Sequence, residues 1–171
     1  MSSWSIDTSH SELSFSVRHM MFAKVRGQFT KWSATVTDEG GRLTGVEVVV
    51  DVGSVDTREP QRDGHLRSAD FFDAENHPQM TFSGRAQGDV DANFTLVGDL
   101  TIRGTTRPAT LQVEFLGAGK DPWGNPRRGY RATTRVNRHD FGLDWNAALE
   151  MGGVLVGADV DIEIDVEVVG A

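Results

Sequence analysis

The most constraining feature of the chain is the stretch of residues 154–168, V-L-V-G-A-D-V-D-I-E-I-D-V-E-V. Its even positions carry Val, Ile or Ala, whereas its odd positions after Gly157 carry Asp or Glu. Successive side chains of a β-strand point to opposite faces, so this alternation predicts a strand with one apolar and one hydrated face. A helix is excluded, because at roughly 3.6 residues per turn the acids would be spread around every side.

This predicted strand would span about 50 Å at roughly 3.3 Å per residue, far beyond the usual strand of about 5 to 6 residues. We therefore expect it to bend along the wall of a large sheet. Its apolar face holds only β-branched aliphatic side chains and Ala158. Such a face lines an interior without filling it, which leaves room for a ligand.

Composition indicates one soluble globular domain over residues 1–171, with 38% hydrophobic and 25% charged residues. The formal charge is -8 and no Lys/Arg cluster stands out, so neither nucleic acid nor electrostatic binding to an anionic membrane is expected, and stable membrane insertion is not expected either. The chain shows no signal sequence and no apolar run of about 18 residues, and we expect a cytoplasmic protein. The absence of cysteine excludes disulfides and thiol chemistry.

Seven further strands are predicted from alternating apolar residues, at 12–19, 25–36 with a bulge near residues 30 and 31, 43–53, 79–88, 93–103, 109–117 and 128–137. A short helical connection is expected near 56–73, with Pro60 in its first turn and Ser54, Asp56 or Thr57 as its cap. The acids of this connection are read as caps rather than as general acids or bases. Phe71 and Phe72 on this polar connection need an apolar surface to pack against.

Hairpin-like links between most strands favour an antiparallel arrangement, as either a sandwich or a barrel. A barrel leaves no open edge, and with eight strands its interior either packs solid or holds one ligand. The fold class expected is therefore all-β, an eight-stranded antiparallel barrel with one short helical connection. A ligand cavity is preferred over a solid core because the linings of two long strands are rich in small aliphatic residues.

The five histidines show no metal-ligand spacing, so neither a metal site nor a cofactor is expected. His19 shares the parity of Leu13, Phe15 and Val17 and should point inward at the strand end. It is either a polar group in an apolar lining or a hydrogen-bonded core histidine. No residue is assigned as catalytic.

Several segments resemble the YceI-like family: D-T-S-H-S-E-L-S-F-S-V-R-H, V-R-G-Q-F, R-D-G-H-L-R-S-A-D-F-F-D-A-E-N-H-P-Q-M-T-F-S-G, G-D-L-T-I-R-G-T-T-R-P, N-R-H-D-F-G and V-G-A-D-V-D-I-E-I. The resemblance implies a lipocalin-like barrel whose elongated apolar tunnel holds a polyisoprenoid, and a homodimer. Many relatives carry an export signal, which this chain does not show. The family-like positions are His10, His19, Asp63, His65, Asp70, Phe71 and Phe72.

The hypothesis that follows is a protein that binds, sequesters or transports an isoprenoid lipid, either a polyprenyl chain or an isoprenoid quinone. The aromatic pairs Phe71/Phe72 and Phe141/Trp145 are expected to close the ends of the tunnel. One alternative is an enzyme acting on such a lipid with His19 or Asp70 as acid or base. Another is a structural dimer with a packed core.

The residues predicted to contact the ligand come from the inward parity of the strands and from the aromatic set. They are Leu13, Phe15, Val17, His19, Phe22, Phe29, Trp32, Val48, Val50, Leu66, Phe71, Phe72, Met80, Phe82, Leu100, Ile102, Leu111, Val113, Tyr130, Phe141, Trp145, Val160 and Ile162.

Overall fold

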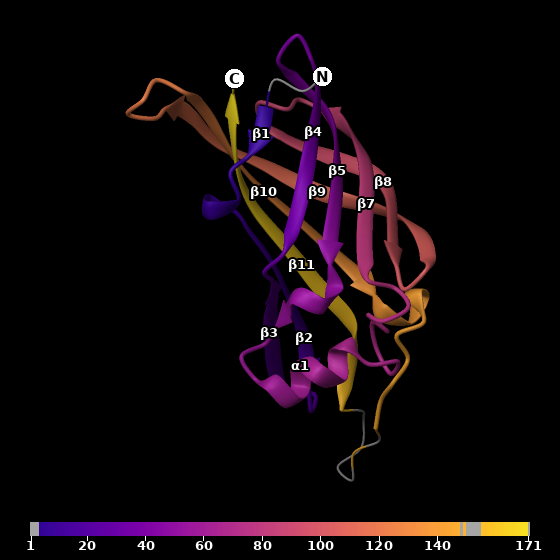
Figure 1. The fold of residues 1–171 in the computed structure, drawn as a ribbon. Helices are drawn as coiled ribbons and strands as arrows, with labels where there is room; N and C mark the ends of the chain where they lie inside the picture. Colours follow the sequence, from indigo (N-terminus) through magenta and orange to yellow (C-terminus); the bar gives the residue numbers. More distant parts are fainter. Residues whose placement is uncertain (1–3, 148, 150–154, 171) are drawn as a thin grey trace.

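The computed structural model describes residues 4–147, 149 and 155–170, and it shows one strongly curled antiparallel sheet with a short helix at one end (Figure 1). The helix is α1 (Pro60–Arg67). The strands are β1 (Trp4–Ile6), β2 (Glu12–His19), β3 (Ala23–Phe29), β4 (Trp32–Glu39), β5 (Arg42–Asp51), β6 (Val55–Asp56), β7 (Gln79–Gly88), β8 (Asn93–Ile102), β9 (Thr105–Lys120), β10 (Pro126–Asn137) and β11 (Val156–Gly170).

The long alternating strand, β11, is the shared wall of the sheet. The hydrogen-bonded order is β4-β5-β7-β8-β9-β10-β11-β2-β3-β6, and β1 pairs with β11 beside this path. β10 follows nearly the whole of β11, whereas the other edge of β11 is divided between β1 near its end and β2 near its start. The predicted strand 154–168 thus exists as β11, and residue 154 lies outside the described residues.

The expected all-β antiparallel class is confirmed, but the sheet has eleven strands rather than eight. β1 and β6, of 3 and 2 residues, are too short to produce a periodic pattern. The predicted bent strand 25–36 is two strands, because β3 pairs with β2 and β6 whereas β4 pairs with β5. The change of parity near Thr30 marks the point where the chain passes from one part of the sheet to another.

The sheet curls into a half-barrel, and in the part of the chain that the structure describes its two edge strands are not hydrogen-bonded to each other to close a full barrel. Within the described residues, no ladder joins β4 to β3 or β6. β1 lies beside β4 instead, and the Trp4 indole N–H donates to the Gly41 carbonyl over 3.0 Å. β1 and its Trp4 side chain therefore cover the edge that a closed barrel would pair.

The predicted helical connection near 56–73 is confirmed as α1, with Pro60 in its first turn. Its cap is Glu59, not one of the predicted residues, because the Glu59 carboxylate accepts from the backbone N–H of Arg62. Asp63 within α1 is buried and accepts from the Thr57 N–H at 2.8 Å and from the Thr57 hydroxyl at 2.6 Å. These bonds hold α1 against the chain that leads into it.

The middle and far part of the barrel holds a continuous cluster of buried side chains that include Val48, Phe82, Phe94, Leu96, Leu100, Leu111, Val113 and Tyr130. The ring of Phe82 lies over Gly84, where an added Cβ would stand 2.6 Å from the ring. At the far end, the guanidinium of Arg128 lies 4.5 Å from the centre of the Phe115 ring and donates to the Tyr130 hydroxyl. We call this region the packed end.

The acids on the outer face of β11 were expected only to be hydrated. The structure pairs them with arginines of the neighbouring strand β10, with N···O distances of 2.9 Å for Arg131 and Asp165 and 2.7 Å for Arg135 and Asp161. Exposed ion pairs of this kind contribute at most about 1 kcal/mol each. They align β10 with β11 and leave the burial of the inner face as the main stabilising term.

Candidate functional site

An apolar cavity of about 450 Å³ occupies the end of the barrel that carries α1. Small-molecule sites typically measure about 300 to 1,000 Å³ and are mostly apolar, so this volume is in the ordinary range for a binding site. The wall is formed by β2, β3, α1, the segment after α1, the segment around η3 (Arg138–Phe141) and the first half of β11. We call this region the cavity end.

The two strands that form the long wall of the cavity are β2 and β11. Their register places Phe15 opposite Ile162 and Val17 opposite Val160. All four side chains line the cavity and are half-buried. Phe15 and Ile162 also border a polar groove on the outside of the sheet.

Glycine at position 27 allows the Phe15 ring to lie flat against β3. A Cβ at this position would stand 2.5 Å from the ring of Phe15 and 2.8 Å from the Thr57 methyl group. The Phe15 ring centre then lies 5.5 Å from that of Phe29, which in turn lies 5.8 Å from that of Phe72. A continuous row of aromatic rings therefore runs from β2 to the segment after α1.

The two aromatic pairs predicted to close opposite ends of a tunnel lie at the same end. Phe71 and Trp145 have ring centres 5.6 Å apart, and His65 of α1 makes edge contacts with both, at 5.0 and 4.6 Å. The expectation that the two pairs close opposite ends was wrong, because Phe71 of one pair packs against Trp145 of the other. The aromatic residues form one side of the cavity.

Most polar groups among the lining residues come from β2, from α1 and from its cap: Arg18, His19, Glu59, Gln61, Arg62 and His65. The Arg62 guanidinium is held in place by the Thr57 hydroxyl at 2.7 Å and the Thr57 carbonyl at 2.8 Å. An apolar cavity with a polar rim on two elements can hold an aliphatic chain and leave a polar head group near water.

Arg138 is a lining residue that sequence reasoning missed. It is only 4% exposed, and its guanidinium donates to the carbonyls of Leu143, Trp145, Val156 and Gly157. Burial lowers the pKa of this group below its ordinary value. Arg138 joins the aromatic side of the cavity to the start of β11, and no local sequence pattern separates it from the surface arginines of β10.

Fourteen of the twenty-three predicted residues line the cavity: Leu13, Phe15, Val17, His19, Phe29, Leu66, Phe71, Phe72, Met80, Ile102, Phe141, Trp145, Val160 and Ile162. Their contact with a ligand stays a prediction.

The other nine predicted residues lie away from the cavity wall. Phe22 is exposed and Trp32 is half-buried at the start of β4. The remaining seven are buried in the packed core: Val48, Val50, Phe82, Leu100, Leu111, Val113 and Tyr130. Strand parity identified the inward face correctly, but it carries no information about how far along the barrel the open volume extends.

The two residues considered as acid or base are not brought together. His19 lines the cavity, whereas Asp70 is exposed and its Oδ2 lies 2.8 Å from Nε2 of His65. Within the part of the chain that the structure describes, no carboxylate lies within hydrogen-bonding distance of the His19 ring. Asp70 is therefore paired with His65, which lines the cavity, and not with His19.

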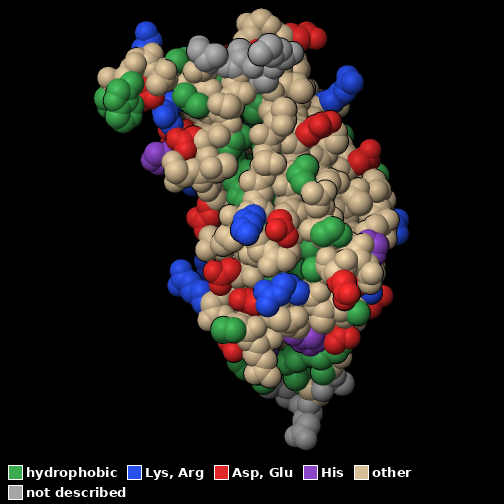
Figure 2. All heavy atoms as spheres, in the orientation of Figure 1, with side chains coloured by type: hydrophobic (Ala, Val, Ile, Leu, Met, Phe, Trp, Pro, Cys, Tyr) green, Lys and Arg blue, Asp and Glu red, His purple; other side chains and the backbone are tan. Residues whose placement is uncertain are grey.

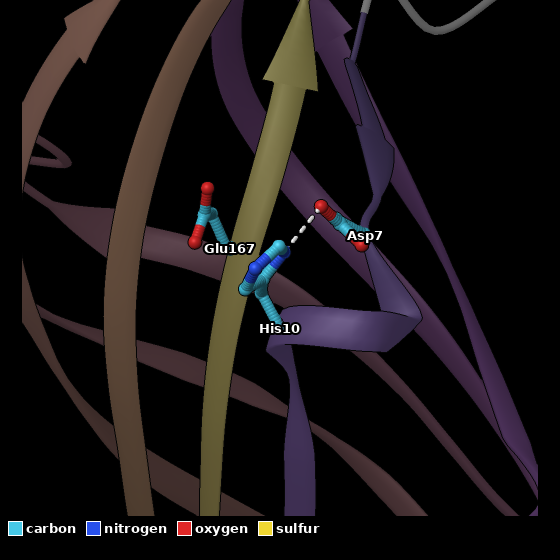
Figure 3. A group of neighbouring side chains, drawn as sticks. All are labelled: Asp7, His10 and Glu167. Atoms are coloured by element: carbon cyan, nitrogen blue, oxygen red, sulfur yellow. Dashed lines mark hydrogen bonds and ion pairs between the residues drawn. The ribbon is translucent and has the colours of Figure 1, made fainter. Parts of the chain in front are cut away.

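Asp7, His10 and Glu167 lie close enough together to share a metal ion (Figure 3), and none of the three lines the cavity. Both oxygens of Asp7 are already used, because Oδ1 accepts from the N–H and hydroxyl of Ser9 and Oδ2 from His10 and Arg127. The bonds from Ser9, His10 and Arg127 lower the pKa of Asp7, and the bond to Asp7 raises the pKa of His10. The guanidinium occupies the position that a cation would need, which makes this a structural ion-pair cluster.

The fold and the cavity together define a lipocalin-like half-barrel with an apolar cavity at one end. Residues 4–168 match the family described as YceI-like domain. A UPF0312 protein of Staphylococcus epidermidis is 35% identical over 170 residues, covering 98% of this chain and 97% of that protein. The chain belongs to the YceI-like family, as its motifs had indicated.

Two solved structures show the same fold. BcnA of Burkholderia cenocepacia superposes with a TM-score of 0.80 at 21% identity, covering 95% of this chain and 98% of that chain. A domain from Saccharophagus degradans, described as polyisoprenoid binding, superposes with a TM-score of 0.71 at 15% identity, covering 99% of each chain. In the described part of this chain, the one helix is too short and too polar to cross a bilayer.

Proposed function

We propose that this protein binds an isoprenoid lipid, with part of the hydrocarbon chain inside the cavity and the polar head near α1 and the end of β2. The observation that carries the proposal is the apolar cavity of about 450 Å³ between α1 and the strands β2 and β11. Membership of the YceI-like family and a structural neighbour described as a polyisoprenoid-binding domain support the same ligand class.

The chemistry of the wall fits a branched hydrocarbon better than a polar ligand. Aliphatic and aromatic side chains alternate along it, and each methylene that they remove from water contributes about 0.8 kcal/mol. A prenyl chain offers many such groups in a row, so binding needs no metal or nucleophile. The rim residues Arg18, His19 and Arg62 are then left to interact with the head group.

The proposed role is sequestration or transport of a polyprenyl chain or an isoprenoid quinone. The homodimer and the cytoplasmic location inferred from the sequence stay predictions. The ligand and its role are tested by organic extraction of the purified protein followed by mass spectrometry.

Two blocking variants and one matched control sharpen this experiment. Ile162→Trp and Val17→Trp place an indole in the cavity from adjacent strands, whereas Val97→Trp adds the same group at an exposed position of β8. We expect a prenyl lipid from the wild type and from Val97→Trp, and little from either blocking variant. Equal lipid content in all four folded proteins would contradict the proposed site.

A further inference from the structure

The turn between β2 and β3, residues 20–22, exposes apolar side chains at the cavity end of the molecule. Phe22 is 69% exposed and Met21 is 51% exposed. We call residues 20–22 the β2–β3 tip. The residues that enter and leave it, Arg18, His19 and Val25, line the cavity, and the Met20 N–H donates to the Leu155 carbonyl over 2.8 Å.

The backbone of the tip is unfavourable for the residues that it carries. Met20 and Met21 have φ angles of 53° and 69°, in the left-handed region that hairpins normally fill with Asn or Gly. Long apolar side chains in this position gain nothing from burial, since Met21 and Phe22 project into water. Folding stability therefore does not explain the sequence of this turn.

The tip also has its own electrostatic character. The chain carries a formal charge of -8, yet residues 13–37 contain four basic residues and no Asp or Glu. Arg18 and Lys24 lie directly opposite each other on β2 and β3, a pairing of like charges that is unfavourable in water. The pKa of Asp161 is lowered by its bond to Arg135 and, to a smaller extent, by the charge of Lys24, so this acid already has a cationic partner other than Lys24.

From these observations we infer that the β2–β3 tip docks the protein on an anionic lipid bilayer. Met21 and Phe22 enter the interfacial region, while Arg18 and Lys24 lie at the level of the lipid phosphates. Apolar side chains flanked by cations are the typical composition of segments that bind at this depth. The contact is shallow and reversible, which agrees with a chain that has no membrane-spanning helix among its described residues.

A bilayer explains the tip better than a protein partner does. Stable protein interfaces bury about 800 Å² on each side, far more than two exposed side chains on one turn can offer. The position of the tip beside the cavity rim also gives a hydrocarbon ligand a short path out of the bilayer. That last step rests on the proposed function, whereas the docking itself does not.

The molecule offers an internal control at its opposite end. The β9–β10 hairpin projects away from the barrel and carries Trp123, which is 81% exposed (Figures 1 and 2). Asp121 fixes this hairpin by accepting from the backbone N–H groups of Trp123 and Asn125. Trp123 has the exposed area to bind a membrane interface but lies far from the cavity.

The experiment is sedimentation of the full chain with vesicles of phosphatidylcholine, with and without phosphatidylglycerol. The wild type should bind the anionic vesicles, and added salt should weaken binding. Replacing Met21→Ser and Phe22→Ser together should reduce binding about tenfold, and replacing Arg18→Gln and Lys24→Gln together about 30-fold. Trp123→Ser should bind as the wild type does.

Three results would overturn the inference: no binding of the wild type to anionic vesicles, undiminished binding by the Met21→Ser/Phe22→Ser variant, or loss of binding only in Trp123→Ser. Ile162→Trp separates docking from ligand binding, because a blocked cavity should leave sedimentation unchanged. Circular dichroism and thermal melting check that each variant is folded. If no lipid is extracted from the wild type but the tip still directs vesicle binding, the proposed ligand fails and the docking surface stands.

Discussion

The packed end and the cavity end of this half-barrel are built from strands of similar character, yet one is solid and the other is hollow. At the packed end, β7, β8 and β9 direct Phe82, Leu100 and Leu111 toward one another. At the cavity end, β2 and β11 direct Val17 and Val160 toward α1, whose inward side is largely polar.

The difference lies in what stands opposite each strand. Large side chains facing one another fill the packed end to the density of an ordinary core. At the cavity end the opposing element is a short, largely polar helix, which bonds between Asp63 and Thr57 hold against the chain that leads into it. We expect these bonds to fix the position of α1 and so to keep the apolar space open.

The largest expected effect comes from opening a hole in the packed end. Phe82→Ala removes a buried ring that lies over Gly84, and we expect the free energy of unfolding to fall by about 3–5 kcal/mol. Urea unfolding followed by circular dichroism measures this loss. A loss below about 1 kcal/mol would show that the packed end is not close-packed.

The second largest effect is expected for Asp63, whose replacement tests whether hydrogen bonds of α1 keep the cavity open. Asp63→Ala leaves the buried Thr57 N–H without its acceptor, and we expect a loss of about 1–3 kcal/mol and a closed or disordered rim. Asp63→Asn is the matched control, because its amide oxygen still accepts one bond. Urea unfolding measures the loss of stability, and hydrogen exchange of α1 measures the disorder at the rim. Equal results for Asp63→Ala and Asp63→Asn would show that the hydrogen bond to Thr57 does not have this role.

A matched pair of valines compares the two ends directly. Val113→Ala at the packed end should cost about 2 kcal/mol, since it removes two buried methyl groups and leaves a new hole. Val17→Ala should cost less than about 1 kcal/mol, because its side chain already faces open volume. Thermal and urea unfolding of the ligand-free variants measure both costs. Equal costs would mean that the two ends are packed alike.

The smallest effect concerns the ion-pair cluster that attaches residues 7–10 to β10 and β11. Burial opposes ionisation of Asp121, but bonds from Arg127, Asn125 and the Trp123 N–H lower its pKa to about 2 from an ordinary value of 3.8. A lowered folded-state pKa contributes stability above pH 3.8 that disappears as the pH falls toward 2. Urea midpoints over this range should therefore fall less steeply in Arg127→Gln than in the wild type.

The pKa shift of His10 has the opposite sign, because the bond to Asp7 raises its pKa from an ordinary value of 6.5. Its contribution is complete below pH 6.5 and is lost as the pH rises through the folded-state value. His10→Gln should remove this small alkaline decline in the urea midpoint. If the urea midpoint of His10→Gln declined with pH as steeply as that of the wild type, a titrating group other than His10 would be responsible for the decline.

The sequence predicted the inward face of the strands well, because alternation in β2, β7, β8 and β11 is a local property of the chain. It could not predict the path of the sheet. The division of 25–36 into β3 and β4 depends on pairing with β2 and β5, which lie on opposite sides of the break. A strand as short as β6 is defined only by its pairing with β3, and two residues are too few to show an alternating sequence pattern.

The candidate site was predictable in its chemistry but not in its extent. Phe71 and Phe72 stood out as apolar residues on a polar connection, and both line the cavity. Arg138 gave no signal, since its four carbonyl partners come from segments that only the fold brings together. The boundary between hollow and solid depends on side chains that meet across the barrel, far apart in sequence.

The most direct test of the central claim is photocrosslinking with an isoprenoid analogue that carries a diazirine near the middle of its chain, followed by peptide mapping. Our account predicts adducts in β2, in the segment from α1 to Phe72 and in the first half of β11, and a large reduction in Ile162→Trp. Adducts concentrated in β8 and β9 at the packed end, or labelling unchanged by Ile162→Trp, would contradict the claim that the cavity beside α1 is the lipid-binding site.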